Sequence, residues 1–205
     1  MIVETPFISS PRLFLKLVTK QDVLEIINYF YQNKDYLAPW QPLWHSNFLT
    51  QEFWQQQLEE NLKEFQSDRS LKLFIFKAQS TEIIGQVNFN NFVRGAAQFC
   101  YLGYSLAEIE QGKGYMAEAL QATINYVFQE LNMHRVMANY IPENRRSSNV
   151  LKKLGFVVEG YAREYLFINR LEEKCWHFQL AIEIVLHVIP SGLKAIQVQD
   201  LKCFI

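Results

Sequence analysis

The sequence is poor in the features that mark several classes of protein. Its three cysteines, Cys100, Cys175 and Cys203, have unrelated spacings and include no Cys-x-x-Cys pair. This pattern is neither a disulfide framework nor a zinc-ligand arrangement, so we expect reduced thiols that pack in the structure, and no metal site. Only 8 residues are Gly and 6 are Pro, and they form no linker or low-complexity segment. The lack of linkers and low-complexity segments favours one continuous domain.

An excess of charge and long apolar runs are also lacking. The 20 Lys and Arg residues are balanced by 21 Asp and Glu residues, for a net charge of −1. A nucleic-acid binder would need a basic surface that this balance does not supply. No apolar run reaches the length of a membrane-spanning helix, and residues 1–6 lack the basic and apolar regions of a secretion signal. We therefore expect a cytoplasmic protein that binds neither nucleic acid nor a membrane.

What the chain does contain is enough apolar material for a core. Hydrophobic residues make up 49% and aromatic residues 15% of the 205 positions. A chain of this length and composition folds as one ordinary domain. We assign residues 1–189 to that single domain. Residues 190–205 follow Pro190 without a clear hydrophobic pattern and are expected to be a C-terminal extension.

Hydrophobic periodicity predicts the order of the elements. The early strands are joined as hairpins and the later ones alternate with helices, which predicts an α+β or three-layer α/β domain. Strands are expected at 12–18, 71–77, 82–93, 98–106, 135–141, 156–159 and 176–188. Helices are expected after Thr19, at about 50–66, at about 112–131 and from Asn144 to Leu154, while 35–44 reads as irregular.

A glycine motif stands where the long helix is expected to begin, and it consists of Gln111, Gly112, Lys113, Gly114, Tyr115 and Met116. Free backbone N–H groups and the helix dipole at such a start favour a pyrophosphate. The glycines also fit the Gly-x-Gly-x-x-Ala dinucleotide pattern. A nicotinamide enzyme is nevertheless the weakest interpretation, because the motif lies at mid-chain after an antiparallel hairpin.

A second motif follows about thirty positions later, with Asn144, Ser147 and then Leu154-Gly155-Phe156. The order strand, Gln-Gly-Lys-Gly, long helix, strand, Asn-x-x-Ser, short helix and Leu-Gly-Phe resembles the GNAT acetyltransferase superfamily. Within it the chain is most similar to the RimJ type of ribosomal-protein-alanine N-acetyltransferase. Matching stretches, among them Tyr36-Leu-Ala-Pro-Trp40 and Cys100-Tyr-Leu-Gly-Tyr-Ser105, cover most of residues 13–166.

The resemblance implies a GNAT fold that binds acetyl-CoA. Its central, twisted mixed sheet is flanked by about four helices and splays between the fourth and fifth strands, here about 99–106 and 135–141. The pyrophosphate would take the N–H groups of Gln111 to Met116, with Lys113 either offsetting phosphate charge or simply exposed. The pantetheine arm would pair with the backbone of Tyr104, Ser105 and Leu106, where a bulge in the strand would face the thioester carbonyl.

The resemblance also assigns the reacting groups. Asn144 would bind the pantetheine arm and Ser147 would protonate the departing thiolate, although an Asn followed by Ser three positions later is also an ordinary helix cap. Tyr140 or Tyr161 could serve the thiolate instead. Glu164 would be the acid that faces the acceptor, or else an ion-pair partner on a strand surface. The family's turn glycine and aspartate are replaced here by residues 169–174, so the chain departs from the family at the acceptor end.

These motifs predict direct transfer of acetyl from acetyl-CoA to the N-terminal α-amine of a protein. The acceptor implied is an Ala or Ser terminus, that of a ribosomal protein being the expected case, and the enzyme would be a monomer or homodimer. An α-amine titrates near pH 8 and a lysine above 10, so a terminus needs only a modest base. Trp40 and Trp44 would line the acceptor side or pack a loop. Acetylation of a small amine (an aminoglycoside, a polyamine or an amino-acid conjugate) and a non-catalytic CoA-binding or ribosome-associated role remain alternatives.

Overall fold

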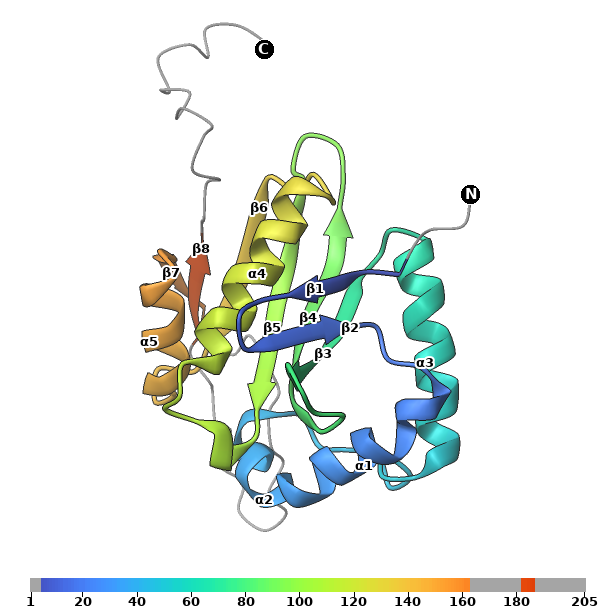
Figure 1. The fold of residues 1–205 in the computed structure, drawn as a ribbon. Coiled ribbons are helices and arrows are strands. Elements are labelled where there is room, and N and C mark those ends of the chain that lie inside the picture. The colour runs from blue at the N-terminus through green and yellow to red at the C-terminus, as the bar shows by residue number, and fades with distance from the viewer. Residues whose placement is uncertain (1–4, 163–181, 187–205) are drawn as a thin grey trace, which may run out of the picture.

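The computed structural model describes residues 5–162 and 182–186, which form one mixed sheet covered by helices (Figure 1). Within these residues the sheet has eight strands in the order β1-β2-β3-β4-β5-β6-β8-β7. All neighbours pair antiparallel except β5 and β6, which are parallel. The strands are β1 (Phe7–Ser9), β2 (Leu13–Lys16), β3 (Leu71–Lys77), β4 (Ile83–Val93), β5 (Phe99–Leu106), β6 (Arg135–Tyr140), β7 (Val157–Ala162) and β8 (Ile182–Leu186).

Helices cover both faces of the sheet, as the three-layer expectation requires. The helical elements are η1 (Lys20–Asp22), α1 (Val23–Gln32), α2 (Lys34–Leu37), η2 (Ala38–Trp40), α3 (Gln51–Gln66), η3 (Glu108–Glu110), α4 (Tyr115–Gln129) and α5 (Arg145–Lys153). One core packs α4 and α5 on the sheet, with Leu120, Ile124 and Leu151 among its buried residues. The other packs α1 and α3 on the opposite face around Phe30, Trp54 and Phe74.

The sheet opens between β5 and β6. Their parallel pairing begins at Phe99 with Arg135 and stops at Leu102 with Ala138. Beyond that point β5 continues to Leu106 in register with β4 alone among the described strands. The predicted splay is therefore confirmed, and it leaves one backbone edge of residues 103–106 free for a ligand. The strong twist is visible in Figure 1, where β1 and β2 cross the view while β5 stands nearly upright.

Several boundaries differ from the expectation for physical reasons. The long helix begins at Tyr115, because Gly112 and Gly114 hold φ values of +73° and +80° that no α-helix contains. The expected bulge near Tyr104 to Leu106 is wrong: pairing with β4 is regular from Leu106 to Tyr101, and the register shift lies at Asn90/Val93. Strand β1 was not expected, because only its central residue, Ile8, is buried.

Other differences concern segments with weak patterns. Residues 35–44, expected to be irregular, begin with the end of α2 and with η2, whose Pro39 fits the first turn of a helix. Strand β7 runs three residues beyond the expected 159. Strand β8 occupies five residues of the expected 176–188, and the others lie outside the described residues. The proposed extension at 190–205 also lies outside them.

Candidate active site

The glycine motif forms a turn that leads directly into α4. Gly114 is the N-cap of this helix and has no side chain to cap it, and the first intrahelical donor is Glu118 N, 3.1 Å from Gly114 O. The N–H groups of Tyr115, Met116 and Ala117 consequently have no acceptor within the helix. Together with the positive end of the helix dipole they are available to an anion, as the motif predicts.

Arg12 anchors this turn from the far end of the chain. Its Nη1 donates to Lys113 O at 3.0 Å, and its Nε donates to Glu118 Oε2 at 2.7 Å. Glu118 Oε1 accepts from Arg12 N at 2.9 Å and from Ser10 Oγ at 2.8 Å. The carboxylate in the first turn of α4 thus ties β1–β2 to the motif. Sequence analysis missed Arg12, because nothing local links positions 106 residues apart.

Replacing Glu118 with Gln is expected to lower the free energy of unfolding by about 2 kcal/mol near pH 7, the usual contribution of charge-assisted hydrogen bonds. Burial acts to raise the pKa of Glu118, but the hydrogen bonds from Arg12 and Ser10 outweigh it and leave the pKa below its ordinary value. Such a carboxylate contributes stability above its unfolded pKa of about 4.3 and loses it as pH falls through the native pKa.

Denaturant titrations of wild type and Glu118→Gln near pH 7 and near pH 3 test this. The difference in unfolding free energy should shrink on acidification, because protonation removes the carboxylate in the wild type as well. An equal difference at both pH values would contradict the assignment. Glu59→Gln is the control, since Glu59 pairs with Lys20 where both side chains are more than half exposed and solvent screens such a pair.

The ammonium of Lys113 is held by an acid and does not stand free. Its Nζ lies 2.8 Å from Glu110 Oε2, and Lys77 Nζ lies 2.7 Å from Glu110 Oε1. Burial disfavours the charged form of Glu110, but both lysines outweigh it and hold its pKa below the ordinary range. Lys113 therefore balances Glu110 in this geometry, and its expected role toward phosphate stays a prediction.

Gln111 connects the turn to the opposite wall. Its Nε2 donates to Tyr36 OH, which also accepts from Arg146 Nη1 at 3.1 Å. Tyr36 belongs to α2 and Arg146 to α5, so one hydroxyl joins three segments around the mouth of the splay. Gln111 Oε1 is buried without a hydrogen-bond partner among the described residues.

Asn144 and Ser147, two of the predicted site residues, lie close to the part of β5 that has left β6. Asn144 caps α5, and its Oδ1 accepts from Ser147 N at 3.1 Å, so the capping interpretation is confirmed. Ser147 Oγ lies 2.8 Å from Tyr104 OH. Burial raises the pKa of Tyr104 to about 12, so the phenol stays protonated at neutral pH. Sequence analysis considered only the backbone of Tyr104 and missed its hydroxyl as a partner of Ser147.

The opening also contains polar atoms that lack partners. Asn139 Oδ1 and Tyr140 OH, both on β6, are buried without a hydrogen bond among the described residues. Orphaned buried polar atoms are costly unless a ligand or water completes them. The free edge of β5, these two atoms and the N–H groups of α4 fit a long ligand with amide and phosphate groups, as pantetheine pyrophosphate is. Ser105 Oγ is already engaged, 2.8 Å from Tyr29 OH, which leaves its backbone for the expected contact.

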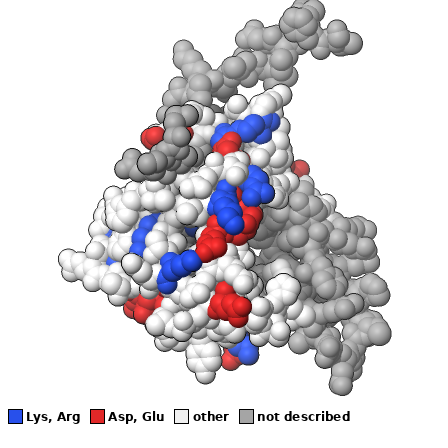
Figure 2. Space-filling view, turned by 90° about the vertical axis from the view of Figure 1, so that its right-hand side faces the viewer, with Lys and Arg blue, Asp and Glu red and all other residues white. Residues whose placement is uncertain are grey.

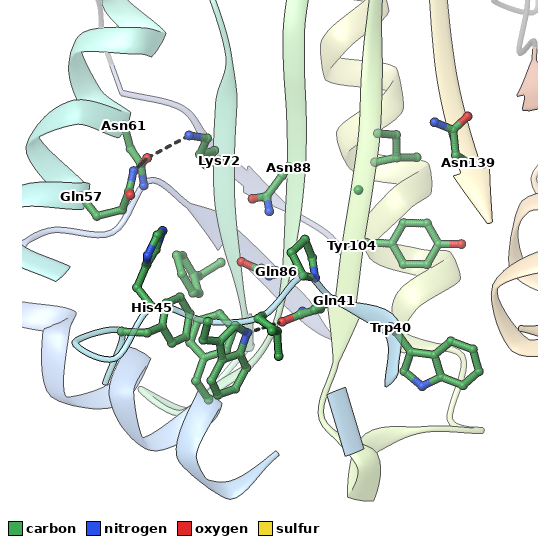
Figure 3. A pocket seen from close by; sticks show the side chains of 18 of the residues that line it. Trp40, Gln41, His45, Gln57, Asn61, Lys72, Gln86, Asn88, Tyr104 and Asn139 are labelled. Carbon is green, nitrogen blue, oxygen red and sulfur yellow. Dashed lines mark hydrogen bonds between the residues drawn. The ribbon is translucent and has the colours of Figure 1, made fainter. Parts of the chain in front are cut away.

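A cleft of about 600 Å³ runs from this opening across the sheet to α3. Figure 3 shows Tyr104 and Asn139 at one side, Lys72 with Asn61 at the other, and Gln86 and Asn88 between them. Its outer wall is the segment that follows η2. Trp44 lines the cleft and also packs on Phe48 with ring centroids 4.5 Å apart, so the loop-packing interpretation is confirmed and its role on the acceptor side stays a prediction.

Gly103 lies on the floor of this cleft in β5. A Cβ built on it meets no atom within 4 Å, and its φ is not in the left-handed region. A strand glycine with open space above it marks a place where a ligand approaches the backbone closely. Sequence analysis had no signal for it beyond its place in a matching stretch.

The remaining expectations have different outcomes. Glu164, the expected acceptor-side acid, and residues 169–174 lie outside the described residues. Tyr161 is described on β7, is 57% exposed and is absent from the cleft lining, which leaves it a poor candidate for protonating the thiolate.

Cys100 is a fully buried core residue as expected. Among residues 5–162 and 182–186 no cluster of three or more His, Cys, Asp or Glu could hold a metal, and no helix is long and apolar enough to cross a membrane.

Comparison with known proteins agrees with this geometry. Residues 12–157 match the family model of the acetyltransferase (GNAT) domain. The ribosomal protein uS5-alanine N-acetyltransferase of Escherichia coli is 41% identical over 163 residues, 79% of this chain and 84% of that protein. The solved ribosomal-protein-S5-alanine acetyltransferase from Vibrio fischeri has a TM-score of 0.83 and 32% identity, covering 92% of this chain and all of that one.

The same fold occurs in Mycobacterium smegmatis RimJ, solved in complex with CoA-disulfide. Its TM-score is 0.78 at 23% identity, over 89% of this chain and 86% of that one. The family model matches most of the chain, and the relatives are of similar length. Both findings agree with the motifs, which predicted the GNAT family. This chain therefore belongs to the GNAT acetyltransferase family.

Proposed function

We propose that this protein transfers the acetyl group of acetyl-CoA to the N-terminal α-amine of a protein, an Ala or Ser terminus of a ribosomal protein, by direct transfer in a ternary complex. The observation that carries the proposal is the continuous cleft that starts at the splay beside Tyr104 and Ser147 and leads over Gly103 to α3. A bound acyl donor and a chain terminus can enter it from different sides. The relatives named for acetylation of ribosomal-protein alanine support this acceptor.

The residues at the opening supply what amine acetylation requires. The departing thiolate needs a proton, and the Tyr104 phenol, although burial weakens it as an acid, is still more acidic than a serine hydroxyl and is the better source. Ser147 Oγ at 2.8 Å can pass or orient that proton. Asn144 keeps its amide Nδ2 for a ligand while Oδ1 caps the helix. Acetyl-CoA, when bound, supplies the activated acyl group, and the thioester needs no help from a metal or an acyl-enzyme.

A small-molecule amine is the principal alternative acceptor. Polyamine sites need carboxylates to pair with their ammonium groups. Among the described residues that line the cleft none is Asp or Glu, whereas Lys72 and His45 are both present. This lining disfavours a polycation. A non-catalytic CoA-binding protein would not need the hydrogen-bonded Tyr104 and Ser147 pair.

Acetyl-CoA-dependent thiol release distinguishes these acceptors. Short peptides that begin with Ala, Ser, Met or Thr should be compared with N-blocked lysine peptides and with spermidine. We expect turnover only on free termini, with Ala and Ser ahead of Met. Turnover confined to spermidine would overturn the proposed acceptor. Silence on every amine, while acetyl-CoA still raises the melting temperature, would indicate a non-catalytic protein.

A further inference from the structure

The far end of the cleft carries a cation. Lys72 lies on β3 and lines the cleft, with its side chain 24% exposed. Its Nζ donates to Glu64 Oε2 at 2.8 Å and to Asn61 Oδ1 at 3.2 Å. An ammonium has three N–H donors, so these two contacts leave one. In Figure 3 the Lys72 side chain and Asn61 are joined at the end of the cleft opposite Tyr104.

Glu64 holds this ammonium from outside the cleft. It belongs to α3, is not part of the cleft lining, and also accepts from Ser70 Oγ at 2.7 Å. Lys72 therefore lines the cleft, whereas its ion-pair partner Glu64 does not. Figure 2 shows basic and acidic groups next to each other on one outer face of the molecule. Lys20–Glu59 and Arg69–Glu60 are two exposed ion pairs of the chain. Lys72 differs from Lys20 and Arg69, because it lines the cleft and they do not.

Strand register gives the distance from Lys72 to the reacting end. Lys72 pairs with Asn88, and Asn88 pairs with Gly103. Two strand spacings are roughly 10 Å, and an extended chain covers about 3.3 Å per residue. A peptide whose amine reaches Gly103 and whose chain follows this row thus brings its third or fourth residue to Lys72. The amides of Gln86 and Asn88 between the two ends can bind the peptide backbone.

We infer that Lys72 is a specificity-determining residue that binds an acidic side chain at the third or fourth position of an extended acceptor peptide. This rests on the proposed transfer to a protein N-terminus and names the acceptor class of that site more closely. Among the described residues the cleft lining holds no Asp or Glu that could pair with a cation at the same position of the acceptor, so the lining favours an acid there.

Peptides with an Ala terminus that carry Glu, Gln or Lys at one of positions two to five test the inference. The wild type should prefer Glu over Lys at position three or four by about tenfold in kcat/KM, the usual value of one charge-assisted hydrogen bond. Lys72→Gln should abolish the preference at that position and leave it unchanged at the other positions. The preference should weaken at high salt, because ions screen it.

Three further variants keep the test decisive. Lys72→Arg retains the charge and should keep the preference for Glu. This variant still tests the inference if Lys72→Gln folds poorly. Glu64→Gln removes the counter-charge and should strengthen it. Lys20→Gln is the matched control, because Lys20 also pairs with a glutamate, at 2.6 Å from Glu59 Oε1, yet lies outside the cleft; it should change nothing.

The outcomes separate this inference from the proposed function. Failure of the wild type to acetylate any peptide terminus would overturn the proposed function. Turnover of the peptides with the same Glu-to-Lys ratio in wild type and Lys72→Gln would overturn the inference alone. Equal turnover of a dipeptide and a six-residue Glu-containing peptide would show that the acceptor does not extend to Lys72.

Discussion

Replacing Tyr104 with Phe is expected to lower kcat about a hundredfold, at the lower end of what a positioned acid contributes. The affinity for acetyl-CoA should hardly change, because the anion site at the start of α4 is separate from this hydroxyl. The loss should lie in kcat, since the proton is needed only as the thiolate departs. Steady-state kinetics with an Ala-terminal peptide, together with the shift in melting temperature caused by CoA, measure the two quantities.

The pair with Ser147 sharpens this prediction. Ser147→Ala should cost less than Tyr104→Phe, and the double variant little more than Tyr104→Phe, because the 2.8 Å contact makes the two hydroxyls one unit. Tyr161→Phe is the control, since Tyr161 is exposed on β7. A large loss in Tyr140→Phe with normal activity in Tyr104→Phe would move the role to Tyr140, whose OH is also buried in the opening.

The pH profile gives a second test of the same assignment. Burial raises the pKa of Tyr104 to about 12, with the hydrogen bond to Ser147 acting in the opposite direction. A proton donor with so high a pKa stays protonated throughout the neutral pH range. The wild-type rate should therefore rise with pH as the acceptor amine loses its proton near pH 8, without a descending limb until well above that value. A fall between pH 8 and 9 would point to a different acid.

Sequence patterns located the parts of the site that depend on neighbouring residues. The glycine motif that precedes α4 and the cap at Asn144 are such local features, although the helix begins at Tyr115 and not at about 112. A left-handed turn or a cap requires particular residue types within four or five positions. Such requirements can be seen in one sequence without knowledge of its tertiary contacts. The family resemblance then assigned both motifs to the binding of acetyl-CoA.

Contacts between distant segments could not be predicted in this way. Tyr104 and Ser147 are separated by 43 positions. Lys72 reads as an ordinary exposed strand lysine until the register places it in line with Asn88 and Gly103. The cleft exists only because β3, β4 and β5 lie side by side under α3 and the segment after η2. Its chemistry is a property of that packing, which no single stretch of sequence contains.

The largest effect on acceptor use alone is expected from Gly103→Val. The new side chain would enter the cleft where a Cβ now meets nothing within 4 Å, and the backbone conformation of Gly103 does not require glycine. Valine suits a strand, so the fold should survive. Crowding a well-shaped site costs about 1–3 kcal/mol, and more where the space is needed for a ligand. We expect kcat/KM for an Ala-terminal peptide to fall about a hundredfold.

Acetyl-CoA binding decides what such a loss means. Its phosphates are expected at the turn before α4, and its arm along the edge of β5 that faces away from β4, so the shift in melting temperature caused by acetyl-CoA should be preserved. Gly160→Val is the matched control, because Gly160 is also a strand glycine with open space at its Cβ but does not line the cleft. If Gly103→Val weakened acetyl-CoA binding as much as peptide turnover, donor and acceptor would share the space above Gly103. Unchanged turnover would place the acceptor elsewhere and remove the basis for the peptide path from Gly103 to Lys72.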